Sequence, residues 1–217
     1  MNVKTIVVKQ NILAANAEMA EKNRQMLDSH HIRMVNMMSS PGSGKTSLIL
    51  QTIRHLTHKY RIAVIEGDIA SSIDTDRIIQ QSIPAVQINT AGGCHLDAQM
   101  VAKALNNLEL DKIDLIFVEN VGNLVCTADF DLGAHKNAVI LSIPEGDDKP
   151  YKYPLIFVEA DVVLVNKIDV LPYFDFKLDH FPEMIRGMNP SAGVIPISAK
   201  TGEGMVHWIS WIEEMLN

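Results

Sequence analysis

Residues 39–46 combine serine, glycine, lysine and threonine in an order suited to binding phosphate. They read Ser-Ser-Pro-Gly-Ser-Gly-Lys-Thr and match G-x-x-x-x-G-K-[ST] except that Ser39 stands at the first glycine position. An apolar run precedes them and a helical pattern follows, so N–H groups at the helix start can face an anion. A glycine-rich turn without a ligand is the alternative. We expect six residues to bind a nucleotide: Gly42, Ser43, Gly44, Lys45, Thr46 and Ser47.

Two carboxylates at the ends of expected strands are candidates for a magnesium site. They are Asp68 and Glu119, and Mg²⁺ usually takes one or two protein carboxylates and keeps several waters. We expect Thr46, Asp68 and Glu119 to hold the ion, directly or through water. The expected catalytic residues are Lys45, which would bridge the β and γ phosphates, Glu119, and Asp74, which would orient the attacking water. Asp74 could equally be an acidic residue that only stabilises the first turn of a helix by interacting with the helix dipole.

A second motif, Asn166-Lys167-Ile168-Asp169, has the residue types needed to recognise guanine. The Asp169 carboxylate can accept from guanine N1–H and N2–H₂, a donor pair that adenine lacks, and the Lys167 stem can lie over the base. Further on, Ser198-Ala199-Lys200 resembles the second base-contacting loop of GTPases. These motifs favour GTP over ATP. An ATP-dependent small-molecule kinase is the alternative from another class, and a comparison of the two nucleotides would decide it.

Two cysteines and one histidine form a candidate metal site. Cys94 and His95 follow Gly92-Gly93, and Cys126 comes soon after the strand expected to end at Glu119. Neighbouring side chains point apart on a strand or helix, so Cys94 and His95 can share a metal only from a loop or a helix start. Thiolate and imidazole donors suit Zn²⁺ or Ni²⁺. From these residues alone, two buried free thiols and a loop histidine remain the alternative.

The bulk composition excludes several classes of protein. The chain has 217 residues, 47% of them hydrophobic, and a formal net charge of −7, which argues against a nucleic-acid partner. No segment approaches the roughly 20 apolar residues of a membrane span, and no signal peptide is evident. Two cysteines are too few to staple a domain of this size, so we expect a cytoplasmic protein with reduced thiols.

Strands alternate with helices along the chain, which predicts an α/β fold with a mostly parallel sheet and helices on both faces. We expect strands at 1–10, 32–38, 61–65, 85–88, 113–118, 138–143, 162–165 and 194–197, and helices at 11–29, 45–56, 74–81, 94–108 and 205–216. Residues 120–136 and 144–150 are expected loops. We predict one GTPase domain, residues 1–217, with the strand and helix of residues 1–31 packed on it. The motifs fall at the carboxyl ends of strands, where such sheets bind ligands.

These motifs together resemble the HypB family of hydrogenase nickel-incorporation GTPases over essentially the whole chain. Besides the phosphate loop, the specific segments are 12–16 (Ile-Leu-Ala-Ala-Asn), 66–68, 92–96, 119–126 and 144–150. The resemblance implies a P-loop NTPase fold of the SIMIBI class, which includes signal-recognition-particle and MinD-type GTPases. It implies a GTPase that uses GTP and Mg²⁺ and helps insert nickel into [NiFe]-hydrogenase. It also implies that Cys94, His95 and Cys126 bind Ni²⁺ or Zn²⁺ at the interface of a GTP-dependent homodimer.

The partners implied by the resemblance are a nickel-delivering accessory protein and the hydrogenase large-subunit precursor. This sequence shows no C-x-x-C-type nickel motif near its N-terminus and no histidine-rich stretch, so we expect delivery by a partner rather than nickel storage. A urease-type nickel GTPase is one alternative, although it carries Cys-Pro-His where Cys94 and His95 are adjacent here. A GTPase that chaperones a cobalamin enzyme is another, but it would leave the cysteine and histidine cluster unexplained.

Overall fold

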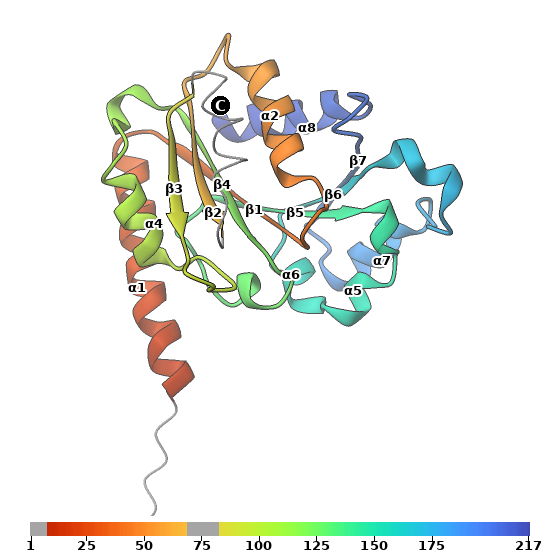
Figure 1. Cartoon of the computed structure of the whole chain (residues 1–217), viewed down its shortest axis with the longest axis horizontal. Helices are drawn as coiled ribbons and strands as arrows, with labels where there is room; N and C mark the ends of the chain where they lie inside the picture. The colour runs from red at the N-terminus through yellow and green to blue at the C-terminus, as the bar shows by residue number, and fades with distance from the viewer. Residues whose placement is uncertain (1–7, 69–82) are drawn as a thin grey trace, which may run out of the picture.

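A computed structural model describes residues 8–68 and 83–217, and its centre is a seven-stranded sheet. The strand order is β3-β2-β4-β1-β5-β6-β7, and every neighbouring pair is parallel (Figure 1). The strands are β1 (Arg33–Ser39), β2 (Ile62–Asp68), β3 (Ala85–Asn89), β4 (Leu115–Gly122), β5 (Lys136–Ser142), β6 (Val162–Asn166) and β7 (Gly193–Pro196). The predicted α/β class with helices on both faces is confirmed, and the expected strands beyond residue 31 are all present with ends shifted by a few residues.

The inner strands are mainly apolar because both faces of the sheet are covered. In β6, for example, Val162, Val163, Leu164 and Val165 are all buried. One shift matters for the site. Strand β4 continues past Glu119 and pairs with β1 as far as Gly122, so Glu119 lies inside the strand and not after its end.

The helices are α1 (Val8–Ser29), α2 (Lys45–Leu56), α4 (Ala98–Leu105), α5 (Lys149–Lys152), α6 (Pro154–Val158), α7 (Phe181–Met188) and α8 (Met205–Leu216). Helices α2 and α8 have the predicted bounds. Residues 8–10 are helical, so the prediction of a strand through residue 10 is wrong for them; the rest of that strand and the helix at 74–81 lie outside the described residues. None of the helices in the described ranges is both long enough and apolar enough to span a bilayer.

Helix α4 begins four residues later than predicted because Asp97 caps it. The Asp97 carboxylate accepts the backbone N–H of Met100 at 2.7 Å, which fixes the helix start at Ala98 and leaves Cys94 and His95 in a loop. The prediction of a loop at 144–150 is partly wrong, since η3 (Ile143–Glu145) and the start of α5 occupy its ends. Helices α5, α6 and α7 are short and have a proline in the first turn. They carry too few turns to give a clear period, which is why the sequence does not predict α7.

The helices cover the two faces of the sheet in separate groups. Helices α2 and α8 pack on one face, where Trp208 is fully buried and its Nε1–H donates to Thr52 Oγ1 at 2.8 Å. On the other face, α1 and α4 cover β1, β2 and β4, whereas α6 and α7 cover β5 and β6 (Figure 1). The phosphate loop therefore emerges on the α2 face, and α1 lies on the opposite face.

Candidate functional site

Two glycines of the phosphate loop adopt backbone conformations that residues with a side chain rarely adopt. Gly42 and Gly44 have φ angles of 75° and 101°, in the left-handed region. A Cβ atom on Gly44 would lie 2.5 Å from Asn166 Nδ2, so this position also needs glycine for space. The loop ends directly at α2, whose first turn can direct N–H groups at an anion.

Lys45 is held inside this loop by the residue that departs from the motif. Its Nζ donates to Ser39 Oγ at 2.7 Å, and its side chain is only 8% exposed. Ser39 is therefore more than a tolerated replacement for glycine, because its hydroxyl positions the ammonium group. A polar residue at the end of a mainly apolar strand is a signal for such a role, but we did not predict it for Ser39.

Thr46 and Glu119 meet beside the phosphate loop. Thr46 Oγ1 donates to Glu119 Oε1 at 2.7 Å, and Glu119 is buried. Hydroxyl and carboxylate oxygens are ligands that Mg²⁺ prefers, so this pair fits the ion. Asp68 ends β2, but its side chain and all of Asp74 lie outside the described residues.

A second buried carboxylate lies next to Glu119 and was not predicted as a site residue. Glu66 of β2 is the register partner of Glu119 of β4, so the two side chains leave the same face of the sheet. Both are buried, at 3% and 6% exposure. This face is the one covered by α2, which brings a second acid to the floor of the phosphate site.

A cavity of about 470 Å³ adjoins the phosphate loop, a volume typical of small-molecule sites. It is lined by residues of α2 and of the two expected base-binding loops: Gly44, Ser47, Leu50, Gln51, Arg54, Asn166, Lys167, Asp169, Val170, Ala199 and Lys200. The structure thus brings together the residues expected to bind nucleotide from three distant segments. Leu50, Gln51 and Arg54 were not predicted as site residues, because nothing in a regular helix pattern marks which side faces a ligand.

Hydrogen bonds orient the side chains of the base-binding loops. Ser198 Oγ donates to Asp169 Oδ1 at 2.6 Å and holds the carboxylate at the cavity. Asn166 accepts the Ala199 N–H at 3.1 Å through Oδ1 and donates from Nδ2 to the Ser43 carbonyl at 2.8 Å. Lys167 Nζ donates to the Gly42 carbonyl at 2.7 Å. The two expected base-binding loops are therefore hydrogen-bonded to each other and to the phosphate loop.

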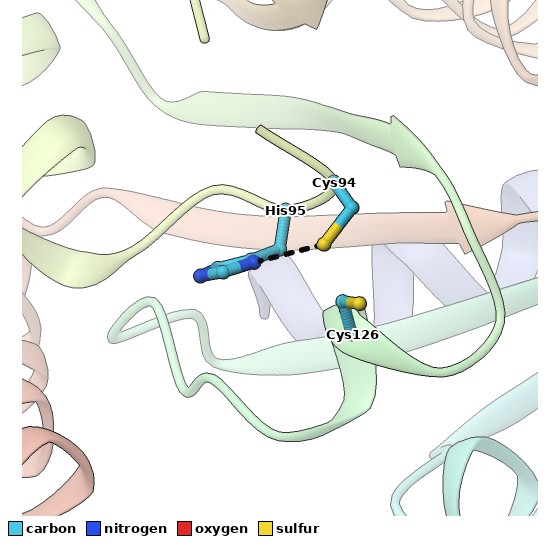
Figure 2. Close-up of side chains that lie close together, drawn as sticks. All are labelled: Cys94, His95 and Cys126. Atoms are coloured by element: carbon cyan, nitrogen blue, oxygen red, sulfur yellow. Dashed lines mark hydrogen bonds between the residues drawn. The ribbon is translucent and has the colours of Figure 1, made fainter. Parts of the chain in front are cut away.

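Cys94, His95 and Cys126 converge on one point (Figure 2). One ligand atom from each lies within 4.8 Å of the others, and Cys94 Sγ is 3.6 Å from His95 Nδ1. Both cysteines are free thiols. Soft and borderline donors in this arrangement fit Ni²⁺ or Zn²⁺ and leave further coordination positions open. A hydrogen bond with Cys94, together with burial, raises the pKa of the Cys126 thiol, so a metal must displace a proton to bind the thiolate.

Local turns orient the side chains of the candidate metal cluster. Ala91 and Gly92 have positive φ angles, and Gly93 N–H donates to the Thr90 carbonyl at 3.0 Å, which reverses the chain before Cys94. The prediction that a helix starts at Cys94 is wrong, and the loop is what lets adjacent residues point the same way. On the other segment, Asn123 Oδ1 accepts the N–H groups of Val125 and Cys126 at 2.7 and 2.9 Å.

The loop that carries Cys94 and His95, which we call the metal loop, packs against β2 and β4. These are the strands that carry Glu66 and Glu119. Leu96 is fully buried against Gly67 of β2, where a Cβ atom would come within 2.7 Å of Leu96 Cγ. Its N–H donates to Asn120 Oδ1 at 3.2 Å, and Asn120 follows Glu119 in β4. The His95 ring also stacks on Phe130, with centroids 3.9 Å apart. A shift at the end of β2 or β4 would therefore move the loop that carries Cys94 and His95.

Comparison with known proteins identifies the family of this chain. Residues 33–196 match the nucleotide-binding domain of the CobW/HypB/UreG family. The chain is 48% identical to hydrogenase maturation factor HypB of Azotobacter vinelandii over 206 residues, which are 95% of this chain and 68% of that protein.

Two solved structures are similar in fold. HypB from Helicobacter pylori in complex with nickel superposes with a TM-score of 0.88 at 35% identity, covering 93% of this chain and 95% of that one. The signal recognition particle receptor FtsY from Elizabethkingia anophelis, in complex with GDP, has a TM-score of 0.55 at 12% identity. It covers 83% of this chain and 66% of that one, and the likeness shows a shared fold. The predicted P-loop NTPase fold, with a parallel sheet and helices on both faces, is confirmed.

Proposed function

Because the chain belongs to the HypB family of hydrogenase maturation factors, we propose that it is a GTP-hydrolysing metallochaperone that helps insert nickel into [NiFe]-hydrogenase. Its partners would be a second copy of itself, a nickel-delivering accessory protein and the hydrogenase large-subunit precursor. Free thiols as ligands suit a reducing compartment, which supports a cytoplasmic protein.

One observation carries the proposal, namely that a thiol and imidazole cluster shares its supporting strands with the phosphate site. Strand β4 bears Glu119 and leads to Cys126, and the end of β2 contacts Leu96 beside His95. A P-loop enzyme that only transferred phosphate would have no need of this cluster. The arrangement suits a protein in which the state of the nucleotide changes the affinity for a metal.

The residues of this chain have separate parts in the reaction. Lys45 would contact the β and γ phosphates, and Asp169 would accept the N1–H and N2–H₂ groups of guanine. Thr46, Glu119 and Asp68 would hold Mg²⁺, which supplies neutralisation of phosphate charge when bound. Asp74 would orient the attacking water. Equal binding of GTP and ATP in a titration would contradict the guanine assignment.

Cys94, His95 and Cys126 would take nickel as cargo. Three ligands leave coordination positions that a second copy can fill, so we propose a dimer with the metal at its interface. GTP would favour this dimer, and hydrolysis would loosen it and release the cargo. The coupling must be reciprocal, because a nucleotide that strengthens metal binding is itself bound more strongly in the presence of metal.

Sedimentation measurements test this coupling. The wild-type dimerisation constant is measured with GDP and with a non-hydrolysable GTP analogue, each with and without Ni²⁺. We expect the strongest dimer with the analogue and Ni²⁺ together. Equal dimerisation in all four conditions would contradict the proposed switch.

A further inference from the structure

The metal ligands lie on two chain segments that are far apart in sequence, and α1 touches both. Cys94 and His95 belong to the segment of residues 94–98, which runs into α4. Cys126 belongs to the segment of residues 126–132. We call these the two ligand segments. Within the cluster the segments are joined by a hydrogen bond between Cys94 and Cys126 and by the stack of the His95 ring on Phe130, but by no covalent bond.

Asn16 of α1 bridges the two ligand segments. Its Oδ1 accepts the backbone N–H of Ala98 at 2.9 Å, and its Nδ2 donates to the backbone carbonyl of Asp131 at 2.7 Å. Asn16 is the last residue of the Ile-Leu-Ala-Ala-Asn segment, which neither the nucleotide site nor the metal cluster uses.

Asn23 of α1 makes a second bridge between the same segments. Its Nδ2 donates to the carbonyl of Ala98 at 2.8 Å and to that of Leu132 at 3.0 Å, and the side chain is 1% exposed. Asn16 and Asn23 are seven residues apart, about two helical turns, so they lie on the same side of α1. A rigid helix therefore contacts each segment at two points.

Close packing fixes α1 against the second segment. Gly133 has a φ angle of 83°, and a Cβ atom there would collide with the Ala20 carbonyl and lie 2.7 Å from Asn23 Cβ. Arg24 also pairs with Asp131 at 3.0 Å. The helix cannot slide along this loop without breaking these contacts.

We propose that Asn16 and Asn23 are positioning residues for the metal, and that α1 sets the separation between Cys94–His95 and Cys126. This inference rests on the metal binding in the proposed function. It adds that metal affinity depends on side chains that do not touch the metal. Loss of an outer-shell partner lowers metal affinity by about 10- to 100-fold in characterised sites, and these bridges act one step further out, through the backbone.

Asn16 is the better position for a test because it is half-buried and its loss leaves Asn23 in place. Asn16→Ala removes both hydrogen bonds, whereas Asn16→Asp keeps an acceptor for the Ala98 N–H but no donor for the Asp131 carbonyl. Asn107→Ala is the matched control, since Asn107 Nδ2 donates to the Lys103 carbonyl at 2.8 Å beyond the other end of α4.

The experiment measures Ni²⁺ affinity by equilibrium competition with a chelator, and records the thiolate-to-nickel charge-transfer spectrum, for the full-length wild type and these three variants. Binding of a GTP analogue without Ni²⁺ and the thermal unfolding midpoint are measured alongside. We expect Asn16→Ala to bind Ni²⁺ about 10-fold more weakly with an altered spectrum, Asn16→Asp to lose less, and Asn107→Ala to match the wild type. GTP-analogue binding should be the same in all four proteins.

Two results would overturn the proposal. One is wild-type Ni²⁺ affinity and spectrum in Asn16→Ala; the other is an equal loss in Asn107→Ala, which would indicate general destabilisation. A wild type that does not bind Ni²⁺ would contradict the proposed function and this inference with it. A wild type that binds, with unchanged binding in Asn16→Ala, would contradict this inference alone.

Discussion

Asn166 Nδ2 donates to the carbonyl oxygen of Ser43 at 2.8 Å and joins the motif expected to bind guanine to the phosphate loop. The same side chain accepts the N–H of Ala199 through Oδ1, so both the oxygen and the nitrogen of its amide form hydrogen bonds. Asn166 is 1% exposed, and a Cβ atom on Gly44 would displace it. The two halves of the nucleotide site are therefore one connected unit before any ligand arrives.

Replacing Asn166 should damage stability and nucleotide binding together. In Asn166→Asp the side chain can still accept from Ala199 but faces the Ser43 carbonyl without a donor. We expect the free energy of unfolding to fall by about 1–3 kcal/mol, the cost of leaving a buried polar group unsatisfied. Urea unfolding measures this loss, and a titration with GDP should show weaker binding. Wild-type values in both measurements would contradict the role of Asn166.

Asp169→Asn should change the base preference while leaving the loop intact. The amide oxygen can still accept from Ser198, but the amide nitrogen would face the guanine N2–H₂ donor. We expect GTP affinity to fall by about 10- to 100-fold, since hydrogen bonds to charged groups contribute about 1.5–3 kcal/mol. Xanthosine triphosphate, which carries an oxygen in place of N2–H₂, should bind this variant better than GTP does. If the variant still binds GTP better than xanthosine triphosphate in a titration, Asp169 is not the residue that recognises guanine.

Gly67→Ala should disturb the metal loop through Leu96. The added Cβ atom would lie 2.7 Å from Leu96 Cγ, and overpacking of this kind costs about 1–3 kcal/mol. We expect weaker Ni²⁺ binding, measured by chelator competition, and partial recovery in Gly67→Ala/Leu96→Ala, which makes room for the methyl group.

Gly187→Ala is the control for this pair, because a Cβ atom there meets nothing within 4 Å. It should bind Ni²⁺ as the wild type does. If the double variant binds Ni²⁺ no better than Gly67→Ala, steric pressure on Leu96 is not the cause.

Structure that forms within one segment of the chain can be predicted from its sequence, whereas contacts between distant segments cannot. The apolar runs that form β1 and β6, and the periodic helices α2 and α8, were predictable because each pattern lies within one segment. The start of α4 was predicted four residues too early. The helical pattern appears to continue back to residue 94, and it does not show that Asp97 caps the helix. The bridges of Asn16 could not be predicted, since its partners lie 82 and 115 residues away and an asparagine on a helix gives no sign of what it will contact.

The stability of the protein should fall as the pH drops through the range in which His135 titrates. His135 Nδ1 accepts the Met34 N–H at 3.0 Å, so the ring is neutral and Nε2–H points at Asp28, 3.2 Å away. Burial lowers the pKa of His135 from its usual value of about 6.5. The unfolded chain therefore binds the proton more readily, and the stabilising contribution is complete above about pH 6.5 and is lost as the pH falls toward the folded-state pKa.

Urea unfolding at about pH 7.5 and about pH 5.5 measures this dependence, on either side of the ordinary histidine pKa. His135→Asn keeps an acceptor for the Met34 N–H but does not titrate, so its stability should change less between the two conditions. Asp28, whose pKa is lowered mainly by its hydrogen bond with His135, titrates below this range. An equal pH dependence in both proteins would exclude His135 as the group responsible.

We propose that the state of the nucleotide controls metal binding at Cys94, His95 and Cys126. Ni²⁺ affinity measured by equilibrium competition, for the wild type and Cys126→Ala, each with GDP and with a non-hydrolysable GTP analogue, tests it most directly. We expect the wild type to have different Ni²⁺ affinities in the two nucleotide states, and Cys126→Ala to bind Ni²⁺ more weakly and to lose this difference. The same Ni²⁺ affinity in all four measurements would contradict it.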